Sequence, residues 1–261
     1  MAAMCFRWDG ELYARISSIQ EEVGDALIRA LSLEPGEHVL DVGCGTGDLS
    51  AKIARQCSSG QVVAIDASES MISEAIARSR DVKNLSLRLL KVEDLRSEHE
   101  FDVVYSNSAF HWVHDTHKAL AALHKALKIT GRIGLQFPLL NERHPLVRQM
   151  NELIDQLGYR RFYAEWESPW FVTTKRDFLT EMGSAGFKNV VAKQQRTKHH
   201  YGSSLDVYDF YSAVGLECYL EPLGRQQNDT FRRRLKDELS LKFHGGTVEL
   251  EIDRIFALGA A

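Results

Sequence analysis

The stretch Val39-Leu40-Asp41-Val42-Gly43-Cys44-Gly45-Thr46-Gly47 decides the fold. It begins in the apolar run 38–42 and ends in a glycine-rich turn that leads into the helical pattern 49–57. Glycines at the end of a buried strand let a ligand approach the backbone and the N-terminus of the following helix, whereas larger side chains would hold it away. The stretch therefore predicts a ligand site at a strand-to-helix turn.

Asp66 adds a second signal. It follows the apolar run 62–65 and lies 19 residues after Gly47. A carboxylate at that place can accept hydrogen bonds from two ribose hydroxyls, so we expect a nucleoside ligand. The glycines run G-x-G-x-G after the acidic Asp41, unlike the G-x-G-x-x-G of dinucleotide sites. Because an anionic side chain repels a pyrophosphate but suits an ammonium group, the pattern argues against a nicotinamide oxidoreductase.

The rest of the chain continues the alternation of short apolar runs and helical patterns, which is typical of a parallel sheet. Ser68 is expected to cap a helix over 70–80, whose inward face would be Met71, Ile72, Ala75 and Ile76. Further strands are expected at 85–90, 103–105, 132–137, 188–201 and 247–258, and further helices at 117–127 and 173–186. We expect a doubly wound, mostly parallel, seven-stranded, Rossmann-like α/β sheet with a helical lid built from insertions.

We expect these elements to form a single domain, 1–261, with distinct parts. The parts are a helical segment 1–36, a cofactor-binding core 37–140, lid insertions 141–172 and 203–244, and segments 173–202 and 245–261 that complete the sheet.

The composition excludes several classes of protein. A formal net charge of -4 argues against a general nucleic-acid binder. The four cysteines form no C-x-x-C pair, so we expect a cytoplasmic protein without a disulfide framework. No apolar run approaches the ~18 residues that a membrane helix needs, and the start lacks an export pattern. We therefore expect neither nucleic-acid nor membrane partners.

Several motifs resemble those of class I S-adenosylmethionine methyltransferases. They are Leu40 to Gly47 (LDVGCGTG), Asp66, Phe101-Asp102-Val103-Val104 and Ser106-Asn107-Ser108-Ala109-Phe110-His111-Trp112-Val113. Within that family, residues 110–115 (FHWVHD) and 8–13 are similar to trans-aconitate methyltransferases. Glu11-Leu12-Tyr13 followed by Gln20 is similar to juvenile hormone acid methyltransferases. Both relatives esterify carboxylic acids, so the resemblance implies this reaction and a small-molecule acceptor.

The resemblance also implies roles for particular residues. The cofactor S-adenosyl-L-methionine would contact Asp41, Gly43, Cys44, Gly45, Gly47, Asp66, Ala67, Met71, Val92, Glu93 and Asn107. Among these, Asp41 and the glycines would hold the methionine end, Asp66 the ribose, and Ala67 and Met71 the adenine. Whether Glu93, Asp94 or only the backbone contacts the amino group of the adenine stays open. Gln20 and Trp112 match positions that contact the substrate carboxyl, and His111 is the third candidate catalytic residue.

The reaction bears on the need for a base. A carboxylic acid with a pKa near ~4 is ionised at neutral pH and needs no general base. A hydroxyl acceptor would need a general base, and His111 or His114 could serve as this base. The spacing of His111, His114 and His117 fits no usual zinc pattern, so we expect no metal. The alternatives are a hydroxyl, nitrogen or carbon methyltransferase of secondary metabolism, and a cofactor-binding module without catalysis.

Substrate selection is expected in the segments that interrupt the sheet pattern. A set of aromatic and basic side chains in these segments could bind a partly apolar acid. The alternative is that these side chains only pack the lid. The set comprises Tyr159, Arg160, Arg161, Phe162, Trp166 and Trp170. In the later strand 188–201, alternation would place His199 and Tyr201 on one face and His200 on the other.

Overall fold

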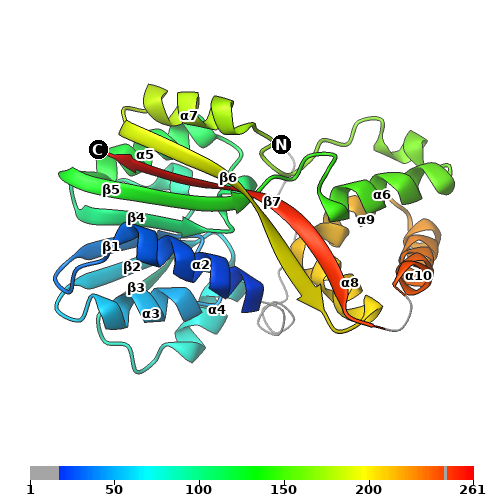
Figure 1. Ribbon diagram of the computed structural model, residues 1–261, viewed down its shortest axis with the longest axis horizontal. Coiled ribbons are helices and arrows are strands. Elements are labelled where there is room, and N and C mark those ends of the chain that lie inside the picture. The colour runs from blue at the N-terminus through cyan, green and yellow to red at the C-terminus, as the bar shows by residue number, and fades with distance from the viewer. Residues whose placement is uncertain (1–17, 244–245) are drawn as a thin grey trace.

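The computed structural model describes residues 18–243 and 246–261, and its centre is one seven-stranded sheet of order β3-β2-β1-β4-β5-β7-β6 (Figure 1). The strands are β1 (His38–Val42), β2 (Gln61–Asp66), β3 (Leu85–Leu89), β4 (Phe101–Asn107), β5 (Leu127–Pro138), β6 (Lys188–Tyr201) and β7 (Val248–Ala260). Strands β1 to β5 pair in parallel, and β7 runs antiparallel to both of its neighbours, β5 and β6. The prediction of a mostly parallel seven-stranded sheet is confirmed.

Helices cover both faces of the sheet. They are α2 (Ser18–Leu31), α3 (Asp48–Gln56), α4 (Glu69–Arg78), α5 (Thr116–Ala126) and α7 (Lys175–Ser184). Helices α2 and α3 share one apolar cluster with Val39 and Val103, whereas α5 and α7 share another with Leu40 and Val104. Side chains that alternate along the strands therefore enter two separate cores, and the central strands are buried on both sides, as parallel strands covered by helices should be.

Helix α4 is capped as expected but faces the sheet differently. The Ser68 side chain accepts a hydrogen bond from the Met71 amide. Met71, Ile72 and Ala75 are buried, but Ile76 is 52% exposed, so its predicted inward position is wrong. At about 100° per residue, Ile76 lies a quarter turn from the centre of the buried face, where the helix borders solvent.

Strand β5 begins earlier than the sequence pattern indicated. It starts at Leu127, directly after α5, and not at 132. Leu127 pairs with Phe101, and a register shift between Phe101 and Val103 accommodates the residues that follow. Ile129 in this part is 83% exposed, so its apolar side chain does not face a core. The early half of the strand was missed because it lacks the buried apolar pattern of the later half.

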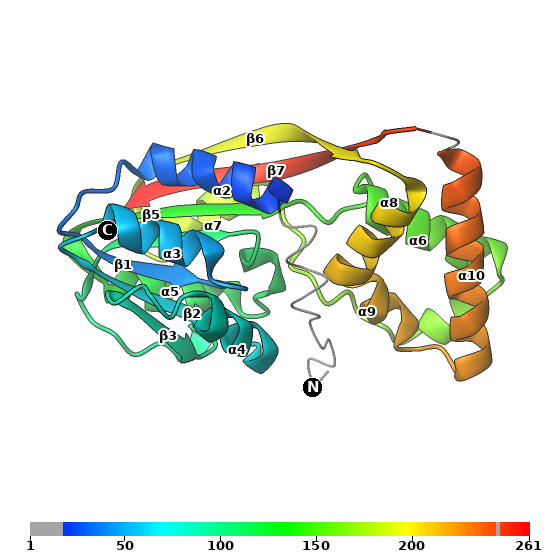
Figure 2. The same cartoon turned by 90° about the horizontal axis from the view of Figure 1, so that it is seen from below.

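A helical layer lies beyond the sheet, at the far end of β6 and β7 (Figures 1 and 2). It contains α6 (Pro145–Gln156), α8 (Ser204–Tyr211), a π-helical turn (Ser212–Leu216), α9 (Glu217–Leu220) and α10 (Arg225–Lys242). These helices have their own apolar cluster, which includes Met150, Phe231 and Trp170. Strands β6 and β7 reach this layer as an extended two-stranded ribbon in Figure 2.

Within the residues that the structure describes, no helix has both the length and the apolar character needed to cross a bilayer.

Candidate functional site

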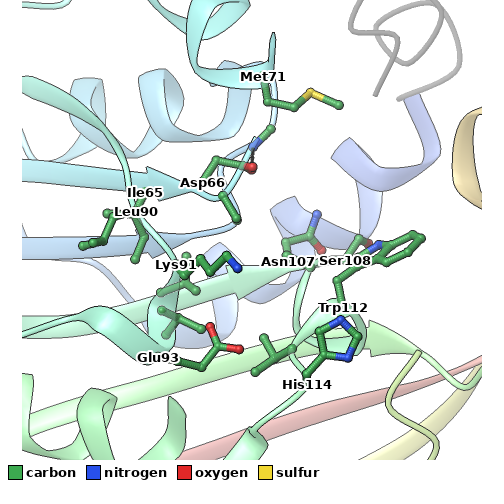
Figure 3. Close-up of a pocket in the computed structure, with 17 residues that line it drawn as sticks. Ile65, Asp66, Met71, Leu90, Lys91, Glu93, Asn107, Ser108, Trp112 and His114 are labelled. Carbon is green, nitrogen blue, oxygen red and sulfur yellow. Dashed lines mark hydrogen bonds between the residues drawn. The ribbon is translucent and has the colours of Figure 1, made fainter. Parts of the chain in front are cut away.

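A cavity opens at the carboxyl ends of β1, β2 and β4; we call it the edge cavity (Figure 3). Its empty volume, open mouth included, is ≈ 890 Å³. In open α/β sheets this edge is where ligands bind. The predicted residues that line it are Gly43, Gly45, Asp66, Ala67, Met71, Val92, Glu93, Asn107 and Trp112.

The glycine turn forms the floor of the edge cavity. Gly43, Gly45 and Gly47 have φ values of 73°, 54° and 80°, in the left-handed region that favours glycine. The amides of Gly43 and Cys44 donate to the Ile65 carbonyl at 2.8 and 3.1 Å, which ties the turn to β2. A Cβ at Gly43 would lie 2.1 Å from Ala109 Cβ, so the turn also packs tightly against the loop after β4.

Asp66 projects from the end of β2 into the edge cavity, as Figure 3 shows. Its carboxylate accepts hydrogen bonds from the Gly45 amide and the Ser68 amide, each at 2.9 Å. Burial raises the pKa of this carboxyl, while the amide hydrogen bonds oppose the rise. The group is therefore fixed in orientation, and a carboxylate can accept further hydrogen bonds from ligand hydroxyls.

Replacing Asp66 by alanine should weaken binding of S-adenosylhomocysteine by ~1–3 kcal/mol, through loss of hydrogen bonds to ribose. Calorimetric titration measures the change. Asp94→Ala is the matched control, because Asp94 is exposed and lies 3.7 Å from Lys118. Equal affinities for wild type and Asp66→Ala would remove the ribose role from Asp66.

A side chamber lies on the other side of the same turn and is lined by Asp41, Cys44, Thr46 and Asn107, among others. Asp41 is 2% exposed and accepts a hydrogen bond from Ser50 Oγ at 2.6 Å. Burial, more than any other cause, raises the pKa of Asp41 to about 7. Asn107 lines both the side chamber and the edge cavity, so one ligand could reach from one into the other.

The raised pKa of Asp41 predicts pH-dependent cofactor affinity. Above pH 7 the carboxylate is ionised and can pair with an ammonium group; below pH 7 it takes up a proton and loses that attraction. Binding of S-adenosylhomocysteine should therefore be about tenfold weaker at pH 6 than at pH 8. Titrations at both pH values measure this, and Asp41→Asn should bind weakly with no such dependence. A wild-type affinity that stays constant between the two pH values would contradict this role.

On the opposite wall of the edge cavity, the two acidic side chains considered for the adenine have different surroundings. Glu93 lines the cavity beside the buried Val92, whereas Asp94 does not and faces Lys118 instead. Both carboxylates belong to the 3-10 turn Val92–Asp94, which turns successive side chains in different directions. Of these two carboxylates, Glu93 is therefore the one that lines the cavity.

An inner pocket adjoins the edge cavity and shares Ser108 and Trp112 with it. The sheet side contributes His111, Pro138, Ile252 and Arg254, and the helical layer with its connection contributes Leu140, His144, Phe210 and Val214. Arg254 is 2% exposed, and its guanidinium donates to Ser108 Oγ and Thr197 Oγ1, each at 3.2 Å. The inner pocket therefore joins apolar walls to a buried cation.

Buried imidazoles surround this cation. Burial and, secondarily, the Arg254 charge lower the pKa of His111 well below its ordinary value and that of His144 to about 3. His199, whose Nε2 lies 2.7 Å from Thr197 Oγ1, has its pKa lowered to about 3 for the same reasons. All three are neutral at pH 7, so Arg254 supplies the positive charge of the inner pocket.

Some predicted residues lie elsewhere. Arg160 is paired with Asp155, and Arg161 lies 4.9 Å from the centre of the Phe162 ring. Trp166 Nε1 donates to the Cys218 carbonyl. The aromatic and basic group 159–170 does not line the edge cavity or the inner pocket. Its charges and rings find local partners within the helical layer, as the alternative of ordinary packing predicts. Trp170 packs against Trp112, at 5.7 Å between ring centres.

The structure leaves other predicted residues undecided. Trp8 and Tyr13 lie outside the described residues, and Gln20 is described only as part of the α2 backbone. His114 lines the edge cavity but is exposed, and Gly47 shapes the turn without lining either cavity. In the ribbon, His199 and Tyr201 are buried and His200 is exposed, so the predicted alternation is confirmed.

Sequence reasoning missed Arg254 and His144. Arg254 lies on the same strand face as Leu250 and Ile252, both of which are buried. A lone arginine at an apolar-face position of an alternating strand was the available signal. No comparable signal marked His144, which lies between the exposed, charged Glu142 and Arg143 and the buried Pro145 and Leu146.

The sheet, the glycine turn and the acidic residue at the end of the next strand define an α/β enzyme that uses a nucleoside cofactor. Residues 33–186 match a family described as a methyltransferase domain, and this match spans more than half of the chain. The chain belongs to this family and is a class I S-adenosylmethionine-dependent methyltransferase.

Individual relatives are distant in sequence. Trans-aconitate 2-methyltransferase of Enterobacter sp. (strain 638) is 24% identical over 252 residues, 95% of this chain and 96% of that protein. Malonyl-[acyl-carrier protein] O-methyltransferase of Bacillus cereus is 32% identical over 124 residues, 46% of this chain and 45% of that protein. A solved structure of Haemonchus contortus phosphoethanolamine N-methyltransferase 2 has a TM-score of 0.61 at 16% identity, over 96% of this chain and 56% of that one, which shows a shared fold.

Proposed function

We propose that the enzyme transfers a methyl group from S-adenosylmethionine to a carboxylate oxygen of a small organic acid. The observation that carries the proposal is the buried guanidinium of Arg254 in a pocket that adjoins the edge cavity through Trp112 and Ser108. Arginine stays protonated at all relevant pH values, and its planar fork matches a carboxylate. The names of the trans-aconitate and malonyl relatives agree with an acid acceptor.

The edge cavity and side chamber suit the cofactor in shape and chemistry. The carboxylate of Asp66 fits the ribose hydroxyls, and Met71, Val92 and Ala67 offer apolar contact to the adenine beside Glu93. Across the Gly43 and Gly45 backbone, the chamber with Asp41, Cys44 and Asn107 fits the charged methionine end. When bound, S-adenosylmethionine supplies a sulfonium methyl group that an incoming oxygen can take in one in-line displacement.

The protein's own residues have three tasks in this reaction. Arg254 binds and orients the acceptor carboxylate, which is already ionised, so no side chain has to remove a proton. Trp112 and Ser108 stand at the junction of the two cavities and position the acceptor toward the cofactor. Neutral His111 adds no charge to compete with Arg254, and the apolar walls exclude water.

We assign the helical layer to the role of a lid. Phe210 and Val214 from this layer, with Leu140 from the connection to it, complete the inner pocket on the side away from β4. The layer is formed by the insertions 141–172 and 203–244, and the cofactor-binding core by 37–140. Gln20 keeps its proposed contact with the acceptor, because the first turn of α2 lies near the glycine turn, where Glu21 lines the side chamber.

The pH profile tests the reaction. With cofactor saturating, kcat/KM for a carboxylic acid should be constant from pH ~6 to ~9 and fall below pH ~5, as the acceptor takes up a proton. The measurement is release of S-adenosylhomocysteine together with detection of the methyl ester. A rate that rises through a pKa above ~7 would favour a hydroxyl or amine acceptor that has to lose its own proton before or during the transfer. Tight cofactor binding without turnover of any acid would favour a binding module.

A further inference from the structure

Two hydroxyl groups hold the Arg254 guanidinium at different nitrogens. Its Nε–H donates to Thr197 Oγ1 and an Nη1–H donates to Ser108 Oγ, each at 3.2 Å. Thr197 belongs to β6 and Ser108 follows β4, so the two contacts come from different parts of the sheet. The guanidinium is planar, and a planar group that is bound at two of its nitrogens cannot turn freely. The plane of the Arg254 fork is therefore fixed.

The proton of each hydroxyl is already used in a further hydrogen bond. Ser108 Oγ donates to Gln136 Oε1 at 3.1 Å, and Thr197 Oγ1 donates to the Ile252 carbonyl at 3.1 Å. A hydroxyl has one proton to donate and two lone pairs that accept. Because both protons are used, both oxygens direct lone pairs at Arg254 and can only accept from it.

His199 fixes the Thr197 hydroxyl in turn. Its Nε2 lies 2.7 Å from Thr197 Oγ1. Since the Thr197 proton goes to Ile252, this nitrogen has to carry a proton and donate it. The Thr197 oxygen then donates once and accepts twice, which is its full capacity. His199 is 1% exposed, and its Nδ1 has no hydrogen-bond partner among the described residues, in agreement with a neutral ring beside the arginine.

Thr197 acts from outside the cavities. Arg254 lines the inner pocket, and Ser108 lines both the inner pocket and the edge cavity, whereas neither Thr197 nor His199 lines either of them. A bound acceptor would therefore meet the guanidinium but not the hydroxyl that holds it. Any effect of Thr197 on an acceptor in the inner pocket passes through Arg254.

We propose that Thr197 is a positioning residue for methyl transfer, which holds the Arg254 fork in the plane that aims the acceptor carboxylate at the methyl group. In the reaction, one carboxylate oxygen bonds to the methyl carbon as the carbon–sulfur bond breaks, and sulfur keeps the electron pair. The attacking oxygen has to lie in line with that bond, and a displacement of ~1 Å can slow such a step by about a hundredfold. This inference rests on the proposed function, because it takes Arg254 as the counter-ion of the acceptor.

Replacing Thr197 by valine separates orientation from binding. The variant keeps a side chain of similar shape and leaves Arg254 with its charge and its contact to Ser108. The KM for a carboxylic acid and the affinity for S-adenosylhomocysteine should therefore change less than about threefold, because the charge that attracts the acid is kept. In contrast, kcat should fall about tenfold, because the bound acid is more often out of line. Steady-state kinetics and calorimetry measure these quantities.

Two further variants make the test specific. Thr197→Ser keeps the hydroxyl, so its kcat should return to within about twofold of wild type. Thr180→Val is the matched control, because Thr180 is exposed on α7 and its Oγ1 donates to the Arg176 carbonyl. This control should keep the kcat and KM of wild type. Thermal unfolding of each variant shows that it is folded.

Four outcomes overturn the positioning role: Thr197→Val keeps its kcat, raises KM without lowering kcat, or loses cofactor affinity as strongly as kcat, or Thr197→Ser loses as much kcat as Thr197→Val. When Arg254→Met loses activity and Thr197→Val does not, only the positioning role is abandoned. When Arg254→Met keeps its activity, or no acid yields a methyl ester, the proposed function itself fails.

Discussion

Replacing Arg254 by methionine is expected to lower kcat/KM for an acid acceptor by about a hundredfold or more, while affinity for S-adenosylhomocysteine changes less than about twofold. The side chain is 2% exposed and lines the inner pocket but not the edge cavity. Loss of one partner from a buried charge pair costs about 2–5 kcal/mol, and each 1.4 kcal/mol is a factor of ten. Steady-state kinetics and calorimetry measure the two quantities separately.

Two further variants make this test specific. Arg254→Lys keeps the charge but loses the planar fork, so it should recover part of the activity. Arg176→Gln on the exposed face of α7 should behave as wild type. Thermal unfolding of each variant confirms that it is folded. An Arg254→Met enzyme that keeps its kcat/KM, or that loses cofactor affinity equally, would remove Arg254 from its role as the acceptor's counter-ion.

Substituting Gly43 by alanine should weaken S-adenosylhomocysteine binding by about a hundredfold or more. The residue has φ 73°, which an alanine adopts only at a cost, and the added Cβ would lie 2.1 Å from Ala109 Cβ. The turn or the loop that carries Ala109 has to move, and both line the edge cavity. Displacements of this kind disturb several ligand contacts at once.

The control for Gly43 is Gly36→Ala. At Gly36 the nearest atom to an added Cβ is Ser59 Oγ at 3.9 Å, an ordinary contact. This variant should bind like wild type and unfold at nearly the same temperature. The comparison uses calorimetry together with thermal unfolding, so that loss of fold is separated from loss of binding. Normal binding by Gly43→Ala would mean that the turn adjusts freely, contrary to its packing.

The sequence predicts the parts of this protein that depend on near neighbours in the chain. The turn after β1, Asp66 at the end of β2 and the Ser68 cap each need only a few consecutive residues to be recognised. Their local geometry follows from glycine conformations and capping chemistry. Most of the residues that line the edge cavity could therefore be predicted from the sequence.

The inner pocket could not be foreseen in the same way. Arg254 pairs across the sheet with Pro138, and its guanidinium reaches Ser108 from a strand at the other end of the chain. The antiparallel insertion of β7 between β5 and β6 creates this encounter, and no periodicity in the sequence encodes which strands are neighbours. Arg160 is the reverse case, because the sequence does not show that its charge is paired with Asp155.

The two cavities draw on different parts of the chain, and this has a consequence for how the enzyme can diversify. The lining of the edge cavity comes from residues 42–114, whereas Leu140, Phe210 and Val214 close the inner pocket from outside that range. Under the proposed function, substitutions at these three positions enlarge or reshape the space for an acceptor and leave the lining of the edge cavity unchanged. We therefore expect that single substitutions can change the substrate preference while S-adenosylmethionine binding stays the same.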